Sequence, residues 1–138
     1  MLLKFVTENI FLIALACVSG GMLVWPLVRR GVGGGASVNT LEATVLMNKK
    51  DSLVLDVRDA GEFAAGHILN ARNIPLDELA TRLKEIERYK DKPVIVSCAT
   101  GNRSGTAAGL LRKSGFTNVA NLSGGMAAWR QAGLPTEK

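Results

Sequence analysis

Short apolar runs alternate with helix-like segments along the C-terminal part of the chain. Residues 53–57 and 94–97 are almost entirely apolar, a pattern typical of strands that are buried on both faces. A weaker strand is predicted over 71–74 and another strand over 118–122. Because strands that alternate with helices favour a parallel sheet, we expect the α/β class: a small parallel sheet with helices on both faces.

Hydrophobic residues recur at helical spacing between these strands. The segment 77–89 places Leu79, Leu83 and Ile86 on one face and charged residues on the other, as in an amphipathic helix. Ser104 suits the N-cap of the helix that follows it. The expected helices cover residues 40–47, 59–65, 77–89, 106–113 and 124–129.

A long apolar segment precedes the predicted domain. Residues 9–28 contain no Asp, Glu, Lys or Arg, and as a helix they would be about 30 Å long, the thickness of a bilayer's hydrocarbon core. Trp25 lies near the end of this segment, where membrane proteins place interfacial aromatic residues. A buried core helix and a cleaved signal peptide are the alternatives, but a signal peptide has a basic start and a shorter apolar core. We therefore expect one retained N-terminal transmembrane helix, an anchor within residues 1–30.

Basic residues indicate the orientation of this anchor. Arg29 and Arg30 directly follow the apolar segment, whereas Lys4 stands alone on its other side. The positive-inside rule then predicts a single-pass protein whose remaining residues lie in the cytoplasm, with the lipid bilayer as an expected partner.

Glycines separate the anchor from the rest of the chain. Residues 31–37 form a flexible linker by composition. Residues 38–138 are enough for one small domain with its own core, and not for two.

Composition excludes several functional classes. The chain has a net charge of +5, but only 5% of its residues are aromatic and no basic block is interleaved with them, so no nucleic-acid partner is expected. Of its two cysteines, Cys17 lies in the apolar segment and cannot reach Cys98 if that segment spans a membrane. One cysteine and one distant histidine are too few ligands for a zinc site, so neither a metal nor a disulfide is expected.

Cys98 stands where a parallel sheet places its ligands, just after the apolar run 94–97 and before the helix predicted at 106–113. Backbone N–H groups and the positive end of a helix dipole meet at such a position and favour thiolate over thiol. They bring a thiol pKa from about 8.5 to roughly 3.5–7.5. Arg103 adds a permanent positive charge, which predicts a nucleophilic sulfur in an anion-binding loop. The alternative is a cysteine that packs as a small buried hydrophobe.

Polar residues after the first buried strand favour a structural interpretation. Asp56, Arg58 and Glu62 have the chemistry for acid–base catalysis, but an ion-pair set that braces the loops is the preferred hypothesis. Asp56 and Arg58 are then expected to support the Cys98 loop from behind. His67, the only histidine, is expected to make a structural hydrogen bond.

Several short motifs occur in a fixed order over the C-terminal part of the chain. They are Asp56-Val57-Arg58, Glu62-Phe63, Gly66-His67-Ile68, Asn73-Ile74-Pro75, the loop from Cys98 to Arg103, and Gly124-Gly125 with Trp129. In order and spacing they resemble the rhodanese family of sulfurtransferases, from Thr40 to Pro135. The resemblance implies a rhodanese fold. Because membrane-tethered single-domain members occur in bacteria, it also implies a protein of the bacterial inner membrane.

The resemblance implies a two-step reaction at Cys98 as well. Cys98 would take the sulfane sulfur of a donor such as thiosulfate, release sulfite and carry a persulfide, which cyanide or a cellular thiol would then remove. No metal or organic cofactor is implied. The persulfide would be held by backbone N–H groups of the loop, namely those of Ala99, Thr100, Gly101, Asn102, Arg103 and Ser104.

Two other functions fit parts of the pattern. Cysteine phosphatases that share this fold have one more residue between cysteine and arginine than the four found here, 99–102, and the tighter ring favours a persulfide. Ala99 and Thr100 are neutral, so Arg103 is the one cationic side chain of the loop that could hold a dianionic donor such as thiosulfate. The second alternative is a membrane-tethered interaction module with little or no turnover, whose anchor would pack small residues against a membrane-protein partner.

Overall fold

The computed structural model describes residues 1–32 and 36–138, and the chain divides into two compact units, Met1–Gly33 and Gly34–Lys138. The three glycines at 33–35, in the predicted linker, lie outside the described residues. The last two residues assigned to that linker, Ala36 and Ser37, belong to a strand of the second unit.

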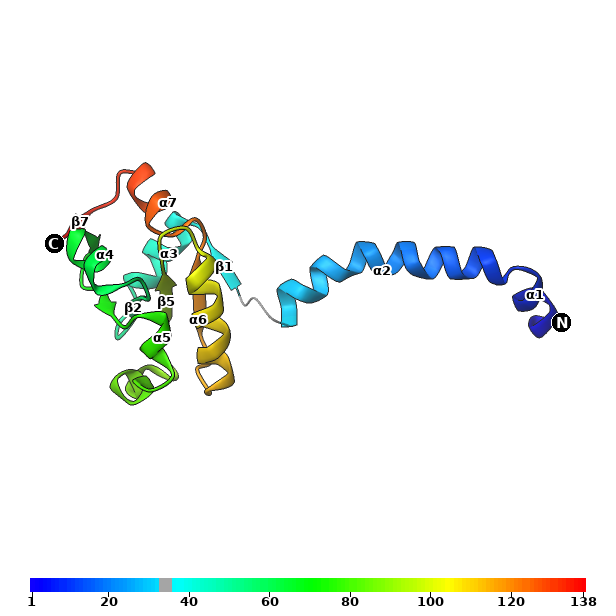
Figure 1. The fold of residues 1–138 in the computed structure, drawn as a ribbon, viewed down its shortest axis with the longest axis horizontal. Helices are drawn as coiled ribbons and strands as arrows, with labels where there is room; N and C mark the ends of the chain where they lie inside the picture. Colours follow the sequence, from blue (N-terminus) through cyan, green and yellow to red (C-terminus); the bar gives the residue numbers. More distant parts are fainter. Residues whose placement is uncertain (33–35) are drawn as a thin grey trace. The chain divides into compact units, whose positions relative to one another are not determined.

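A five-stranded parallel sheet forms the centre of the second unit (Figure 1). Its strands follow the order β1-β6-β5-β2-β4, and every neighbouring pair is parallel. Their bounds are β1 Ala36–Val38, β2 Leu53–Asp56, β4 Arg72–Asn73, β5 Val94–Ser97 and β6 Val119–Leu122. The predicted parallel α/β sheet is therefore confirmed, with the fully buried β5 as its central strand.

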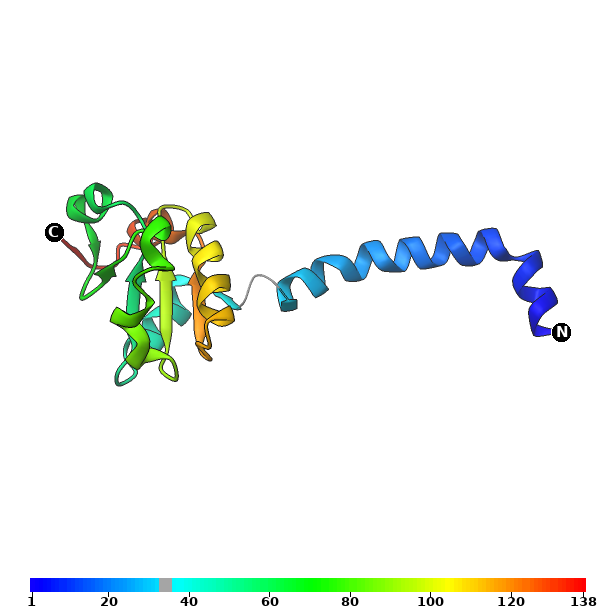
Figure 2. The same ribbon diagram turned by 60° about the horizontal axis from the view of Figure 1, so that its bottom comes forward.

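Helices cover both faces of this sheet, as predicted (Figures 1 and 2). Their bounds are α3 Thr40–Met47, α4 Ala60–Ala65, α5 Leu76–Leu79, α6 Asn102–Lys113 and α7 Gly125–Gln131, with a 3₁₀ helix η1 at Leu83–Tyr89. Val94 and Val96 of β5 pack with side chains of α5, α6 and η1, whereas Ile95 between them packs with side chains of α3 and α7. An apolar run that shows no alternation in the sequence thus serves two separate cores.

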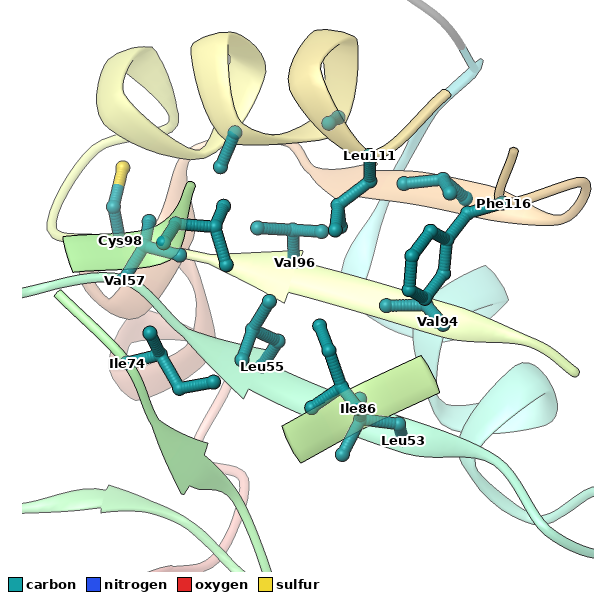
Figure 3. Close-up of a cluster of buried hydrophobic side chains, with 14 residues drawn as sticks. Leu53, Leu55, Val57, Ile74, Ile86, Val94, Val96, Cys98, Leu111 and Phe116 are labelled. Carbon is teal, nitrogen blue, oxygen red and sulfur yellow. The ribbon is translucent and has the colours of Figure 1, made fainter. Parts of the chain in front are cut away.

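Cys98 belongs to the core on the α6 side of the sheet (Figure 3). In that view Cys98 lies at one end of the cluster and Phe116 at the other, with Val96 and Leu111 between them. Val96 and Leu111 are fully buried. This packing holds β5 against α6 and so sets where the residue after β5 lies.

The amphipathic segment 77–89 does not form the single helix that its pattern predicts. It contains α5 and then, after a break, η1. Arg82 at the break has φ −114° and ψ 13°, and the Thr81 hydroxyl donates to the Glu78 carbonyl oxygen at 2.9 Å. Side-chain bonds of this kind compete with helix continuation. The spacing still predicts burial correctly, because Ile86 of η1 is fully buried.

The helix after the Cys98 loop begins at Asn102, earlier than the predicted 106–113. Its N-cap is Gly101, whose φ of +104° lies in the region that favours glycine. The N-cap role expected for Ser104 is therefore wrong. Ser104 lies in the first turn of α6 and is fully buried.

A two-stranded antiparallel ribbon joins β3 (His67–Ile68) to β7 (Thr136–Glu137), a pairing that the sequence pattern does not predict. His67 Nδ1 lies 2.8 Å from the Phe63 carbonyl oxygen, and its ring stacks on Phe63 with centroids 3.7 Å apart. Its Nε2 lies 3.4 Å from Glu137 Oε1. These contacts match the structural role predicted for His67.

The first unit consists of α1 (Leu2–Glu8) and α2 (Ile10–Val32), which are separated at Asn9. Asn9 Nδ2 donates to the Phe5 carbonyl oxygen at 2.9 Å. The Thr7 hydroxyl likewise bonds to backbone carbonyl oxygens of α1. Such local bonds offer the backbone an alternative to a continuous helix.

Neither helix of the first unit, as far as its residues are described, alone has both the length and the apolar character that a membrane span needs. Leu2–Glu8 and Ile10–Pro26 meet both conditions together, as a pair bent by 76°. The described residues therefore do not form the one unbroken transmembrane helix that was expected within 1–30.

Candidate active site

Cys98 directly follows β5, and the loop after it leads into the first turn of α6. The residue is only 1% exposed. Figure 3 shows its sulfur directed toward α6 from the end of the buried cluster. The loop position was predicted correctly, but burial this deep was not, and it means that a reacting atom has to enter the loop to reach Sγ.

Hydrogen-bond donors of the loop converge on this sulfur. The Gly101 N–H donates to Sγ at 3.0 Å, and Ser104 Oγ lies 3.3 Å from Sγ. Burial raises the pKa of the Cys98 thiol, but the Ser104 hydroxyl and the N–H groups of Ser104, Gly101 and Thr100 lower it by more. The net result is a pKa below the usual thiol value, in the direction that the sequence predicts.

Asn121 of β6, the strand beside β5, positions the hydrogen-bond donors around Sγ, which together form the sulfur cradle. Ser104 Oγ donates to Asn121 Oδ1 at 2.5 Å, and Asn121 Nδ2 donates to the Gly101 carbonyl oxygen at 3.2 Å. A hydroxyl has one proton, so Ser104 donates either to Asn121 or to the Cys98 thiolate. Asn121 was not predicted as a site residue, although a polar residue inside the strand predicted at 118–122 was a signal that could have found it.

The first turn of α7 holds the other side of the loop. The Met126 N–H donates to the Cys98 carbonyl oxygen at 2.8 Å, and the Ala127 N–H donates to the Ala99 carbonyl oxygen at 3.1 Å. Gly125 lies against the same backbone with φ +54°. A Cβ atom at Gly125 would overlap the Cys98 carbonyl oxygen and would lie 2.9 Å from the Ala99 carbonyl carbon. This close approach explains why the chain has glycine there.

Arg103 forms a two-pronged ion pair with Glu62 of α4. Its Nη1 and Nη2 donate to the Glu62 carboxylate oxygens at 2.8 and 3.0 Å. The hydrogen bond from Arg103 is the main cause that lowers the pKa of Glu62 to about 2, against the opposing effect of burial. The structure thus brings together two residues that the sequence analysis placed in different groups, the anion-holding loop and the bracing set.

Asp56 and Arg58 form a buried ion pair, as the bracing hypothesis predicts. Arg58 Nη2 lies 2.7 Å from Asp56 Oδ2 and also donates to the Gly66 carbonyl oxygen at 2.8 Å. The Arg58 backbone N–H donates to Asp56 Oδ1 at 3.0 Å. With its oxygens so engaged, the Asp56 carboxylate is poorly placed for proton transfer. The pair braces the segment that leads into α4. The same segment lies directly beside the start of the Cys98 loop, because Asp56 is paired with Ser97 in the sheet and the Val57 N–H donates to the Ser97 carbonyl oxygen at 3.0 Å.

Replacing Ser104 with alanine is expected to slow alkylation of Cys98. Without the Ser104 hydroxyl, burial is opposed by fewer donors, so the pKa of Cys98 rises and less thiolate is present at neutral pH. A hydrogen bond to a charged group is worth about 1.5–3 kcal/mol, and the hydroxyl gives up its bond to Asn121 to make it, so the iodoacetamide rate at pH 7 should fall by several-fold to about tenfold. The pH profile of the rate should move to higher pH.

Ser97→Ala is the matched control for this variant. Ser97 is also a buried serine beside the loop, but its Oγ has no hydrogen-bond partner among residues 1–32 and 36–138. Its replacement should leave the pH profile in place. Equal shifts in the two variants would show that packing, and not the Ser104 hydroxyl, controls the thiolate.

Known proteins share this sequence pattern. The family model described as the rhodanese-like domain matches residues 40–132. YqhL of Bacillus subtilis is 51% identical over 76 residues, which cover 55% of this chain and 59% of YqhL, so the chain spans less than two thirds of that relative's length. The thiosulfate sulfurtransferase GlpE of Pseudomonas putida is 38% identical over 96 residues, which cover 70% of this chain and 84% of GlpE.

Solved structures agree with the sequence relatives. A rhodanese-related protein of Thermoplasma volcanium matches with a TM-score of 0.67 and 36% identity, over 75% of this chain and 98% of that protein. The matched family region contains both the Cys98 loop and the α7 turn that holds it. On the family match and on these relatives, the chain belongs to the rhodanese-like domain family.

Proposed function

We propose that this protein is a rhodanese-type sulfurtransferase in which Cys98 carries the sulfur as a persulfide. The observation that carries the proposal is the cradle around Sγ, where the Gly101 N–H and the Ser104 hydroxyl meet a buried thiol at the carboxyl end of β5. Donors arranged in this way stabilise a thiolate, and after reaction they would stabilise the anionic outer sulfur of a persulfide.

The proposed reaction has two displacements at sulfur. In the first, the Cys98 thiolate attacks the sulfane sulfur of the donor, the donor's bond to that sulfur breaks, and its electron pair leaves with the carrier group. Thiosulfate would leave as sulfite and a persulfide donor as a thiolate. In the second, a thiolate or cyanide attacks the outer sulfur and releases Cys98 as a thiolate. The named activity of the Pseudomonas putida relative supports this chemistry.

Intact-protein mass spectrometry tests the proposal. After incubation with thiosulfate or with a small persulfide, we expect the chain to gain the mass of one sulfur atom, and we expect cyanide or dithiothreitol to remove it. Peptide mapping should place the added sulfur on Cys98. A chain that stays unmodified with both donor classes would contradict the proposal.

We also propose that the first unit anchors the domain in the bacterial inner membrane, with the domain on the cytoplasmic side. Residues 9–28 carry no acidic or basic side chain, and Arg29 and Arg30 follow them. Large apolar side chains of α2, such as Phe11 and Leu23, are exposed in the structure. A lipid environment would cover this apolar surface.

The anchor predicts that the full chain stays with membranes after an alkaline carbonate wash. Protease added to intact spheroplasts should leave the domain uncut, whereas protease added to inverted membrane vesicles should digest it. Release by carbonate would contradict the anchor, and digestion in spheroplasts would contradict the orientation.

A further inference from the structure

The Cys98 loop has one cationic side chain, and the structure shows it already paired. Arg103 is the only Lys or Arg from Cys98 to Ser104. Its guanidinium faces the Glu62 carboxylate with two hydrogen bonds of 2.8 and 3.0 Å. The one positive side chain of the loop is therefore matched by a negative charge from α4.

The position of Glu62 is set by its own helix. The backbone N–H of Asp59, the N-cap of α4, lies 3.3 Å from Glu62 Oε1 and completes a capping box. Because the pKa of Glu62 is lowered to about 2, mainly by the hydrogen bond from Arg103, the carboxylate is ionised at any pH suited to sulfur transfer. Glu62 is thus a fixed negative charge beside the loop.

This charge bears on the choice of sulfur donor. Thiosulfate is a dianion, and it would approach a loop whose one guanidinium is neutralised. A persulfide on a thiol carrier brings at most one negative charge to the reacting sulfurs. It transfers its outer sulfur to the Cys98 thiolate when its S–S bond breaks, and the carrier leaves as a thiolate.

We propose, on the basis of the sulfurtransferase function above, that Glu62 is a specificity-determining residue that disfavours dianionic donors. By holding Arg103 in an ion pair, it favours a thiol-borne persulfide over free thiosulfate as the source of sulfur for Cys98. At a solvent-exposed site and low ionic strength, the Coulomb energy between a dianion and one unit charge within about a Debye length corresponds to roughly a 3- to 10-fold effect on kcat/KM.

Glu62→Gln tests this role because glutamine keeps the side-chain length and can keep the capping box. We expect kcat/KM for thiosulfate to rise by about 3- to 10-fold, while that for 2-hydroxyethyl persulfide changes less than about twofold. The thiosulfate gain should shrink as the salt concentration is raised. Adding Arg103→Gln to Glu62→Gln should remove the gain.

Glu85→Gln is the matched control. Glu85 and Glu62 have side chains that are both 38% exposed, and Glu85 also forms a two-pronged pair with an arginine, Arg82, at 2.6 and 3.0 Å. Replacing Glu85 with glutamine also removes one negative charge, in this case from η1. It should leave kcat/KM unchanged for both thiosulfate and 2-hydroxyethyl persulfide.

If Glu62→Gln changed kcat/KM by the same factor for both donors, or lowered kcat/KM for thiosulfate, the specificity role would be overturned. The sulfurtransferase function would still stand. A wild-type protein that accepts sulfur from neither donor would instead overturn the function itself. The two failures are therefore distinguishable in one experiment.

Discussion

Replacing Cys98 with serine is expected to abolish sulfur transfer, with a loss of at least about 10³-fold in the rate of persulfide formation. A serine hydroxyl is not ionised at neutral pH and forms no persulfide. The substitution is nearly isosteric, and the Gly101 N–H that now donates to Sγ at 3.0 Å still has an acceptor. Loss of activity with an unchanged melting temperature would therefore report on chemistry and not on folding.

Cys17→Ser provides the control, because Cys17 is the other free cysteine and is exposed on α2. Both variants should be incubated with persulfide donor and analysed by intact mass. Cys17→Ser should gain sulfur as the wild type does. If Cys98→Ser gained sulfur and Cys17→Ser did not, the sulfur carrier would have been assigned to the wrong residue.

The burial of Cys98 also predicts how its reaction rate depends on the size of the reagent. With the residue 1% exposed, the hydrogen bonds that favour the thiolate lie inside a closed loop. Reaction then depends on both the ionised fraction and the entry of a reagent. Small reagents fit this limit better than large ones, so the size of an alkylating agent should affect its rate with Cys98 in the folded protein more strongly than its rate with Cys98 in the urea-unfolded chain.

Local sequence patterns predicted those parts of the fold that depend on local interactions. The apolar runs at 53–57 and 94–97 became β2 and β5, and the periodic segment 40–47 became α3 with the same bounds. A strand buried on both faces needs only apolar side chains, and an N-capped helix carries its own start signal. The position of Cys98 after β5 followed from the same reasoning.

Elements that depend on distant partners were not predictable in this way. β1 and β7 are three and two residues long, too short for any pattern, and each exists because another strand pairs with it. Asn121 acts on Cys98 only because β6 lies beside β5, which places Val96 opposite Asn121. The sequence shows that Asn121 is polar, but the sheet order decides what it contacts.

The pairing of Glu62 with Arg103 is a further case. Each residue has an ordinary local role, since Glu62 completes the capping box of α4 and Arg103 lies in the first turn of α6. Only the fold brings them together, across 41 positions of sequence. The donor preference proposed for Glu62 therefore rests on tertiary structure and not on the motif that contains it.

Gly125→Ala is expected to damage the loop and the fold together. Its Cβ would overlap backbone atoms of Cys98 and Ala99, which cannot rotate away as a flexible side chain would. Either α7 or the loop must move, which would break the hydrogen bond from the Met126 N–H to the Cys98 carbonyl oxygen. Overpacking and a left-handed non-glycine residue together cost about 2–5 kcal/mol, and urea denaturation should show a loss of this size. Misplacing the sulfur by about 1 Å should reduce persulfide formation by about 100-fold.

Gly133→Ala separates the two contributions to this loss. Gly133 has φ +70°, close to the +54° of Gly125, but no atom of the described residues lies within 4 Å of a Cβ built there. Gly133→Ala should therefore lose only the free energy of unfolding that backbone strain costs, about 1–2 kcal/mol, and it should form the persulfide normally. Equal stability losses in the two variants would mean that strain explains both. Normal sulfur transfer in Gly125→Ala would show that the contact between α7 and the loop does not position Cys98, because a catalytic sulfur held by that contact could not tolerate its loss.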